Sequence, residues 1–159
     1  MDILDADLIN FWKSLNQFDV KYIMIGGFAV NLHGFSRATN DVDVWLQDEV
    51  NNRKNLGKAL EQFGYGELSF EELDFVPGWT DFYIGSGVRL DIMTNMIGLE
   101  NISFEVALSL ASIAQIKDVK VPFLHINQLI ENKKATNRPK DIIDVIELEK
   151  IIKVRVNKK

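Results

Sequence analysis

The chain has 159 residues and an apolar fraction of 47%, which suits one domain over residues 1–159 with a core of its own. It contains no cysteine, which excludes a disulfide framework and a thiolate zinc site, and its two histidines argue against an all-histidine metal site. The formal net charge of −5 argues against broad, non-specific nucleic-acid binding. Because the N-terminus is acidic and no segment approaches the length of a membrane span, we expect a cytoplasmic protein without a membrane interaction.

Helical and strand patterns alternate along the first half of the chain. Apolar residues recur at helical spacing near the N-terminus, and a short apolar run then ends at Gly26-Gly27, as a buried strand would. Val42, Val44 and Leu46 follow the period of two that marks a strand. In chain order these patterns predict a helix over 4–18, a strand over 20–25, a helix from 27 to about 34, a strand over 39–46 and a helix over 49–63.

The second half of the sequence predicts a hairpin followed mainly by helices. The segments WTDFYIG and VRLDIMT flank a turn around Ser86-Gly87 and are typical of two paired strands. The remaining patterns predict a helix over 103–110, a strand near 119–124 and helices over 126–136 and 139–152. This order indicates an α/β or α+β fold, with a mixed β-sheet flanked by helices and further helices at the C-terminus.

Three aspartates form the most informative pattern for chemistry. Strand residues two apart point to the same face, so Asp41 and Asp43 present neighbouring carboxylates. Asp91 lies between Leu90 and Ile92, which we expect in the core, so its side chain projects to the opposite face. If the two strands are neighbours, the three carboxylates converge in one cleft. Carboxylates this close repel unless a cation joins them, and hard oxygen ligands favour Mg²⁺ or Mn²⁺, as in phosphoryl transfer.

A glycine pair precedes these aspartates. Where an apolar strand runs into Gly26-Gly27 at a helix start, backbone amides can approach a phosphate closely, and the helix N-terminus adds favourable potential. Each signal alone has an ordinary structural explanation: an Asp-x-Asp pair can be a solvated strand face, and a Gly-Gly pair can be a tight turn. The two signals together are far more specific and favour a phosphate-binding site.

The segment IGGFAVNLHGFSRATNDVDVWL resembles the signature of the DNA polymerase β-like nucleotidyltransferase superfamily. That signature has an apolar residue, Gly, Gly or Ser, a spacer and Asp-x-Asp, with a third acid on a later strand. The chain is most similar to small bacterial members that include the AbiEii-type toxins, which also carry His-Gly before Arg-x-Thr-x-Asp-x-Asp and a later element that reads KKATNRPKDIID here. The resemblance spans residues 20–149 and implies the nucleotidyltransferase fold.

Carried over position by position, the resemblance implies a role for each matching residue. Asp41 and Asp43 would bind metal. Asp91 would complete the metal site and help to activate the acceptor hydroxyl. Lys133 and Arg138 would face the phosphates or the acceptor.

The resemblance also assigns a nucleotide contact to the glycine pair. Gly26 and Gly27 would contact the triphosphate, although many active members have Ser at the second position, where its hydroxyl reaches a phosphate. Gly27 keeps its backbone amide, so we interpret the change as a feature of the subgroup. Arg37 suits bidentate binding of a phosphate, with a surface loop arginine as the equal alternative. Thr39 is a nucleotide-binding residue or simply the start of the strand.

Several other polar and aromatic residues are interpreted as structural. Asp141 and Asp144 lie three apart on one helical face, and we expect them to pair with Arg138 or Lys133. His33 is expected to be structural. One aromatic group is expected to belong to the core: Phe75, Trp79, Phe82 and Tyr83.

The leading functional prediction is a metal-dependent enzyme that moves a nucleoside monophosphate from a nucleoside triphosphate to an acceptor hydroxyl and releases pyrophosphate. The acceptor stays open among RNA, a protein and an aminoglycoside-like small molecule. The alternative, from another class, is a catalytically silent module that binds a nucleotide or a partner protein, for example one half of a toxin–antitoxin system. A homodimer is also open. The intact aspartate trio favours the enzyme.

Overall fold

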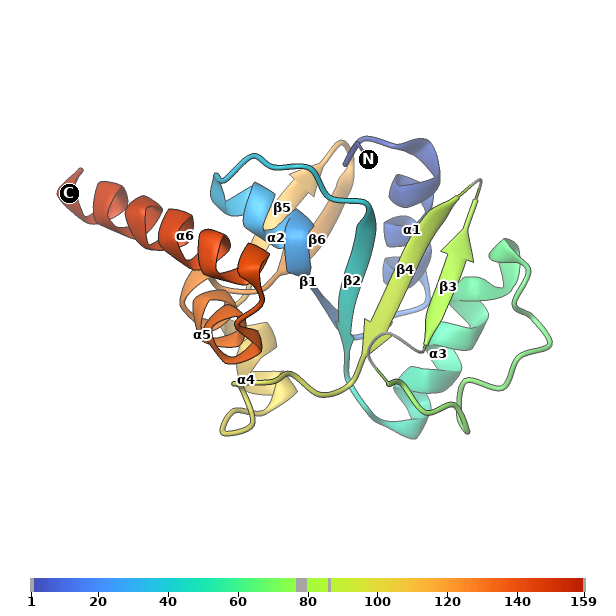
Figure 1. The fold of residues 1–159 in the computed structure, drawn as a ribbon. Coiled ribbons are helices and arrows are strands. Elements are labelled where there is room, and N and C mark those ends of the chain that lie inside the picture. The colour runs from blue at the N-terminus through green and yellow to red at the C-terminus, as the bar shows by residue number, and fades with distance from the viewer. Residues whose placement is uncertain (1, 77–79, 86, 159) are drawn as a thin grey trace.

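The computed structural model describes residues 2–76, 80–85 and 87–158, and Figure 1 shows their arrangement. Helices and strands follow one another in this order: α1 (Ala6–Gln17), β1 (Tyr22–Ile25), α2 (Gly26–His33), β2 (Asp41–Leu46), α3 (Val50–Leu60), the 3-10 helix η1 (Glu61–Phe63), β3 (Asp81–Ile84), β4 (Val88–Met93), α4 (Phe104–Leu110), β5 (Ser112–Ile116), β6 (Val119–Phe123), α5 (Ile126–Thr136) and α6 (Pro139–Asn157).

Every predicted helix and strand is present, and two elements differ from the prediction. Strand β5 was not predicted, because its apolar residue Ile113 is 60% exposed and so obscures the alternation of buried Ala114 and Ile116. Helix α6 continues five residues beyond the predicted end at 152, through a segment where Val154 and Val156 alternate with polar residues and so do not follow the helical period. Ser86, half of the predicted hairpin turn, lies outside the described residues.

The strands form one mixed sheet in the order β3-β4-β2-β1-β6-β5. Strand β2 lies near the middle, antiparallel to β1 and parallel to β4. Strand β6 is parallel to β1, and β3 and β5 close the two edges in antiparallel pairs. The predicted mixed sheet is therefore confirmed, and the parallel pairing makes β2 and β4, which carry the three aspartates, direct neighbours.

The two faces of the central strands differ in chemistry. One face is apolar, and α1 and α3 cover it: Trp12 of α1 stacks on Tyr22 of β1 with ring centroids 5.6 Å apart, and Ser14 of α1 donates a 2.7 Å hydrogen bond to the carbonyl of Ala59 in α3. The fully or almost fully buried residues of this face include Val42, Val44, Leu90 and Ile92. Alternation along the strands therefore directs Asp41, Asp43 and Asp91 to the other face.

The C-terminal helices lie on the same side of the molecule as α2. Helices α5 and α6 pack against each other, and both contact α2. Figure 1 shows that α6 then runs away from the sheet and that the C-terminus lies at its free end. The start of α6 is thus held beside the strand-to-helix turn, while its later turns project.

The side chain of Asn52 connects α3 to the backbone just before β1 and just after β2. Its buried side chain accepts a hydrogen bond from the amide of Lys21 and donates to the carbonyls of Lys21 and Gln47, at 2.7 to 2.9 Å. We expect Asn52→Ala to lower the free energy of unfolding by about 1–3 kcal/mol, because the partly buried Lys21 amide and Gln47 carbonyl lose the hydrogen bonds of the buried Asn52 side chain. Urea denaturation measures this. The neighbouring exposed Asn51→Ala is the control, and equal losses in both variants would contradict the assignment.

Candidate active site

The aspartates of β2 and β4 lie side by side. In the parallel pairing of these strands Asp43 is the partner of Asp91, so both carboxylates project from the same face at neighbouring positions. Asp41 lies two residues before Asp43 on that face. A further acid that the sequence did not single out, Asp81 of β3, is the partner of Asp91 on its other side and forms a 3.2 Å ion pair with Arg89. No spacing in the sequence relates Asp81 to the trio, since only the strand register brings it there.

Burial and like charge act together on Asp43. Burial raises the pKa of Asp43 to about 6, and the negative charges of Asp91 and then Asp41 contribute to the rise. The positive charges of Lys133 and Lys140 oppose the rise only in part. The site therefore carries negative charge that the protein leaves incompletely balanced, which is the electrostatic condition for binding a cation.

The donor set fits a divalent cation that is shared with a phosphate. In the described part of the chain, no three acidic or histidine side chains are gathered so that they could hold a metal ion by themselves. Mg²⁺ is commonly bound through one or two carboxylates together with substrate phosphates and water. Asp43 and Asp91, as in-register neighbours, supply such a pair of hard oxygen ligands.

Gly26 meets a double constraint at the start of α2. Its φ of +71° lies in the left-handed region, and a Cβ at this position would overlap the Oδ2 atom of Asp43. Ile25, which precedes the helix, makes no side-chain capping hydrogen bond. The first amides of α2 are thus held close to the Asp43 carboxylate without a capping side chain of their own.

Gly27 is required for a different reason. A Cβ at Gly27 would lie 2.5 Å from Thr39 Oγ1, 2.8 Å from Thr39 Cβ and 3.2 Å from a guanidinium nitrogen of Arg37. A serine at this position would therefore collide with Thr39. The hydroxyl nearest to the start of α2 at this point belongs to Thr39, which accounts physically for the glycine that departs from the pattern of many active members.

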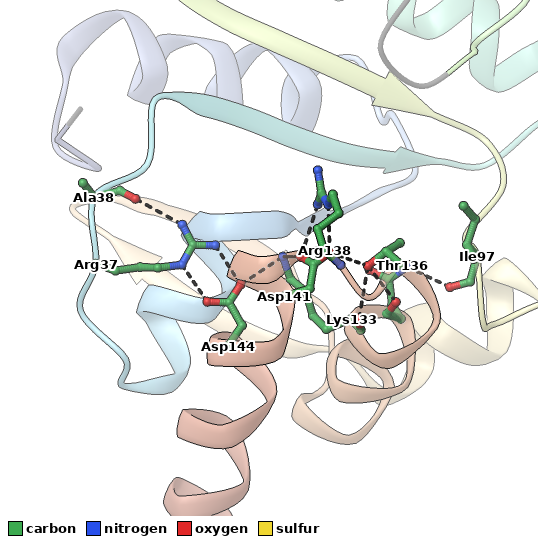
Figure 2. A network of polar contacts seen from close by, with 9 residues as sticks. Arg37, Ala38, Ile97, Lys133, Thr136, Arg138, Asp141 and Asp144 are labelled. Atoms are coloured by element: carbon green, nitrogen blue, oxygen red, sulfur yellow. Dashed lines mark hydrogen bonds and ion pairs between the residues drawn. The ribbon is translucent and has the colours of Figure 1, made fainter.

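A buried ionic cluster joins α5, α6 and the loop before β2 (Figure 2). Asp144 of α6 is fully buried and accepts two hydrogen bonds from Arg37, at 2.7 and 2.8 Å. Lys133 of α5 lies between the acids, 3.2 Å from Asp141 and 3.1 Å from Asp144. Asp141, also fully buried, accepts hydrogen bonds from Arg138. The prediction that Asp141 and Asp144 are structural and pair with Arg138 or Lys133 is confirmed, whereas the pairing of Asp144 with Arg37 was not predicted.

The four bases near the trio differ in how freely they can reach a ligand. Lys133 is almost completely buried and Arg37 is mostly so, with 5% and 21% of their side chains exposed. The side chain of Arg138 is 57% exposed. Its hydrogen bonds to Asp141, together with the charges of Asp141 and Asp43, hold its pKa above the ordinary value. Lys140 is exposed as well. Arg138 and Lys140 are therefore the bases of this group that a ligand can reach most freely, and both interact electrostatically with Asp43.

The remaining side chains of interest are structural, with one correction. His33 is buried and its Nε2 lies 2.7 Å from the carbonyl oxygen of Leu124, as expected of a structural histidine. Phe75 and Phe82 are buried, whereas Tyr83 is 56% exposed, so its prediction as a core residue was wrong. Tyr83 follows Phe82 on an edge strand, and alternation turns it away from the core. Trp79 lies outside the described residues.

A pocket opens beyond the trio on the same face of β2. It has a volume of about 410 Å³ and begins at Trp45, two residues after Asp43, with Phe104 of α4 against the Trp45 ring. The three aspartates do not line it. Carboxylates are frequent in its wall, which includes Asp48, Glu49, Glu100 and Glu105.

A mixed sheet that holds paired carboxylates beside a glycine-led strand-to-helix turn is the arrangement expected of a nucleotidyltransferase. The chain belongs to the family described as "Nucleotidyltransferase of unknown function (DUF6036)", which matches residues 4–158. The predicted enzyme class, a nucleotidyltransferase, is thereby confirmed. The DNA polymerase β-like superfamily and the likeness to AbiEii-type toxins stay predictions. A search of curated protein sequences finds no match. No helix in the described ranges combines the length and apolarity needed to cross a membrane.

Solved structures share the fold at low sequence identity. The lincomycin-bound lincosamide antibiotic adenylyltransferase LnuA is 18% identical, with a TM-score of 0.61 over 92% of this chain and 97% of that one. ANT(2'')-Ia in complex with adenylyl-2''-tobramycin is 16% identical, with a TM-score of 0.58 over 94% and 93%. A nucleotidyltransferase-like protein from Paracoccidioides brasiliensis is 15% identical, with a TM-score of 0.55 over 93% and 84%. At these identities the likeness shows the nucleotidyltransferase fold.

The raised pKa of Asp43 predicts a pH-dependent cost to stability. Between about pH 4, where the unfolded carboxyl titrates, and about pH 6, where the folded one does, the folded protein holds a proton that the unfolded chain has lost. Stability therefore falls as pH rises through this window, and Asp43→Asn should remove that fall. The melting temperature of the variant, measured with a chelator present, should exceed that of the parent at pH 8 and converge with it near pH 4.

Asp118→Asn is the matched control for this measurement. Hydrogen bonds from its own backbone amide and from Lys13 hold the pKa of Asp118 below its ordinary value, so its replacement should not stabilise the protein at any pH. If the melting temperatures of Asp43→Asn and the parent differed by the same amount at pH 4 and at pH 8, the raised pKa of Asp43 would be contradicted.

The packing of Gly27 against Thr39 predicts a non-additive pair of substitutions. Gly27→Ser should lower the free energy of unfolding by about 1–3 kcal/mol through overpacking. In a chain that already carries Thr39→Gly, the same change should cost much less, because the colliding atoms are gone. A double-mutant cycle of chemical denaturation measures the coupling, and strictly additive effects would contradict the contact.

Proposed function

We propose that this protein transfers a nucleoside monophosphate, most directly AMP from ATP, to the hydroxyl of a small molecule and releases pyrophosphate. The observation that carries the proposal is the register of Asp43 against Asp91, next to the amides that begin α2. A structural role does not account for it, since the pairing of these acids raises the cost of ionising Asp43. Membership of a nucleotidyltransferase family supports the reaction type.

The nucleotide is proposed to lie across the start of α2. Gly26 and Gly27 begin α2, and the N-terminus of a helix attracts a phosphate through its free amides and its dipole. The Thr39 hydroxyl lies close to Gly27. Arg138, exposed and near Asp43, is proposed to contact the β- or γ-phosphate. Arg37 and Lys133 are already paired with Asp144 and Asp141. They are therefore proposed to attract the phosphates by their positive charge without direct contact.

Asp41, Asp43 and Asp91 are proposed to hold Mg²⁺ or Mn²⁺ together with the phosphates of the nucleotide, with the in-register pair Asp43 and Asp91 as its main protein ligands. When bound, such an ion neutralises phosphate charge and lowers the proton affinity of a hydroxyl. The role proposed for Asp91 is to accept the proton of the acceptor hydroxyl as its oxygen attacks the α-phosphorus. Asp43, enclosed between Gly26 and Asp91, would be a ligand of that ion, since a carboxylate repels the α-phosphate unless a cation lies between them.

The pocket beyond Trp45 is proposed to receive the acceptor. It opens on the face of the carboxylates and its wall is rich in acids, which disfavours a polyanion such as RNA and favours a hydroxyl compound with positive charge. The adenylyltransferases LnuA, bound to lincomycin, and ANT(2'')-Ia, bound to adenylyl-2''-tobramycin, support a small-molecule acceptor and ATP as donor by analogy of fold.

The test is incubation with each α-labelled nucleoside triphosphate, Mg²⁺ and a panel of acceptors that includes cationic hydroxyl compounds, RNA and cell extract. We expect labelled product and pyrophosphate with ATP and a small acceptor. Asp91→Asn should lower turnover by about 100-fold or more, as loss of a proton acceptor does, while retaining much of the nucleotide affinity. Asp118→Asn, in the turn between β5 and β6, is the control and should keep full turnover.

Thermal melting separates the enzyme from a silent binding module. Mg²⁺ with ATP should raise the melting temperature of the parent, and the double variant Asp41→Asn/Asp43→Asn should lose that shift. A shift without pyrophosphate release from any acceptor would instead identify a nucleotide-binding module. If the labelled product were RNA or protein, the proposed reaction type would stand and the proposed small-molecule acceptor would be wrong.

A further inference from the structure

We propose that α6 is a self-association surface, on which a second copy of this chain docks with its own α6 antiparallel to the first. The inner side of α6 is committed to the molecule, since Asp141, Asp144 and Leu148 are buried. The outer side is exposed or partly exposed along the helix. The occupant follows from the order of side chains along that outer side.

The projecting end of α6 has apolar residues that are open to solvent. Val154 and Val156 are 52% and 63% exposed, and every residue from 153 to 158 is exposed. Figure 1 shows these last turns extending away from the sheet. An isolated helical end gains little from its own hydrogen bonds, so packing of an apolar stripe on another surface is the usual source of its stability.

Four outer residues form a stripe along the helix: Ile143, Glu147, Lys150 and Val154. Their spacing of four, three and four residues keeps them on one side of an α-helix. Ile143 is 53% exposed, and the side chains of Glu147 and Lys150 are 34% and 65% exposed. The stripe therefore reads apolar, acid, base, apolar from the first turns of α6 to the last.

This order is self-complementary only when the two helices run in opposite directions. A two-fold axis midway between Glu147 and Lys150 places Ile143 opposite Val154 of the partner subunit and Glu147 opposite Lys150 of the partner subunit. The same two contacts recur by symmetry, as in any isologous interface. A parallel arrangement would instead set acid against acid and base against base, which disfavours it.

A shallow pocket makes room for the apolar contact. It has a volume of about 230 Å³ and lies between the end of α2 and α6, with Phe35 and Val154 in its wall. In the antiparallel arrangement the side chain opposite Val154 is the partner's Ile143, so each copy presents both a projecting isoleucine and a pocket to receive it. Ile142 and Ile146, each 48% exposed, flank the stripe and widen the apolar area.

The decisive experiment uses charge reversal in trans, with sedimentation equilibrium of the full chain. The parent should form a dimer. Glu147→Lys places one base opposite another across the interface, and Lys150→Glu places one acid opposite another. Each variant alone should therefore dissociate at least about tenfold more readily than the parent. Mixing the two single variants should restore a dimer, because an acid on one copy then faces a base on the other.

Restoration by mixing distinguishes a contact between copies from one within a chain. The internal ion pair between Glu147 and Lys150 is lost in both variants whether they are mixed or not. Ile143→Asp should abolish the dimer while the circular dichroism spectrum and melting temperature show an intact fold. Lys54→Glu, on the exposed side of α3, is the control and should leave the dimer unchanged.

Three outcomes would overturn the proposal. A parent that stays monomeric up to several hundred micromolar, as judged against the affinities of weak homodimers, excludes a second copy as the occupant. A dimer that survives Ile143→Asp uses another surface. Single charge variants that fail to associate when mixed exclude the antiparallel register, even where the parent is dimeric.

Discussion

The buried ionic cluster around Asp144 is the interaction on which the arrangement of the site depends. A fully buried carboxylate is costly unless several donors surround it, and here Arg37 and Lys133 do so from two different parts of the chain. Because Arg37 also borders Gly27, the cluster fixes α6 next to the start of α2. The position of Arg138, at the beginning of α6, follows from that attachment.

Charge is distributed unequally between this cluster and the strand face. In the cluster the acids are matched by bases, whereas at Asp43 burial and neighbouring acids outweigh Lys133 and Lys140, so its pKa is raised. The negative charges of Asp141 and Asp144 are thus balanced by bases. The negative charge around Asp43, beside the proposed nucleotide site, is balanced only in part. Such a contrast is typical of a functional site, where charge is balanced by a ligand and not by the protein.

Local periodicity accounts for what could be predicted from the sequence. The phase of Asp41, Asp43 and Asp91 against their apolar neighbours predicted the face on which they lie, and the strand register agrees. The ion pair of Arg37 with Asp144 spans 107 positions, and no local pattern encodes a contact of that separation. The place of Asp81 beside Asp91 likewise depends on an edge pairing that only the folded sheet specifies.

Helix α6 belongs both to the proposed site and to the proposed interface, because adjacent residues of the helix point to different sides. Asp144 is fully buried in the ionic cluster, whereas Ile143 is 53% exposed on the outer stripe. The ion pairs of Asp144 with Arg37 and of Asp141 with Arg138 lie in the first turns of the same helix whose outer side carries the stripe. A chain of this kind has a physical reason to keep a charged cluster in its interior: apolar packing at Asp144 would hold α6 in place, but without the bidentate geometry that fixes its rotation relative to Arg37.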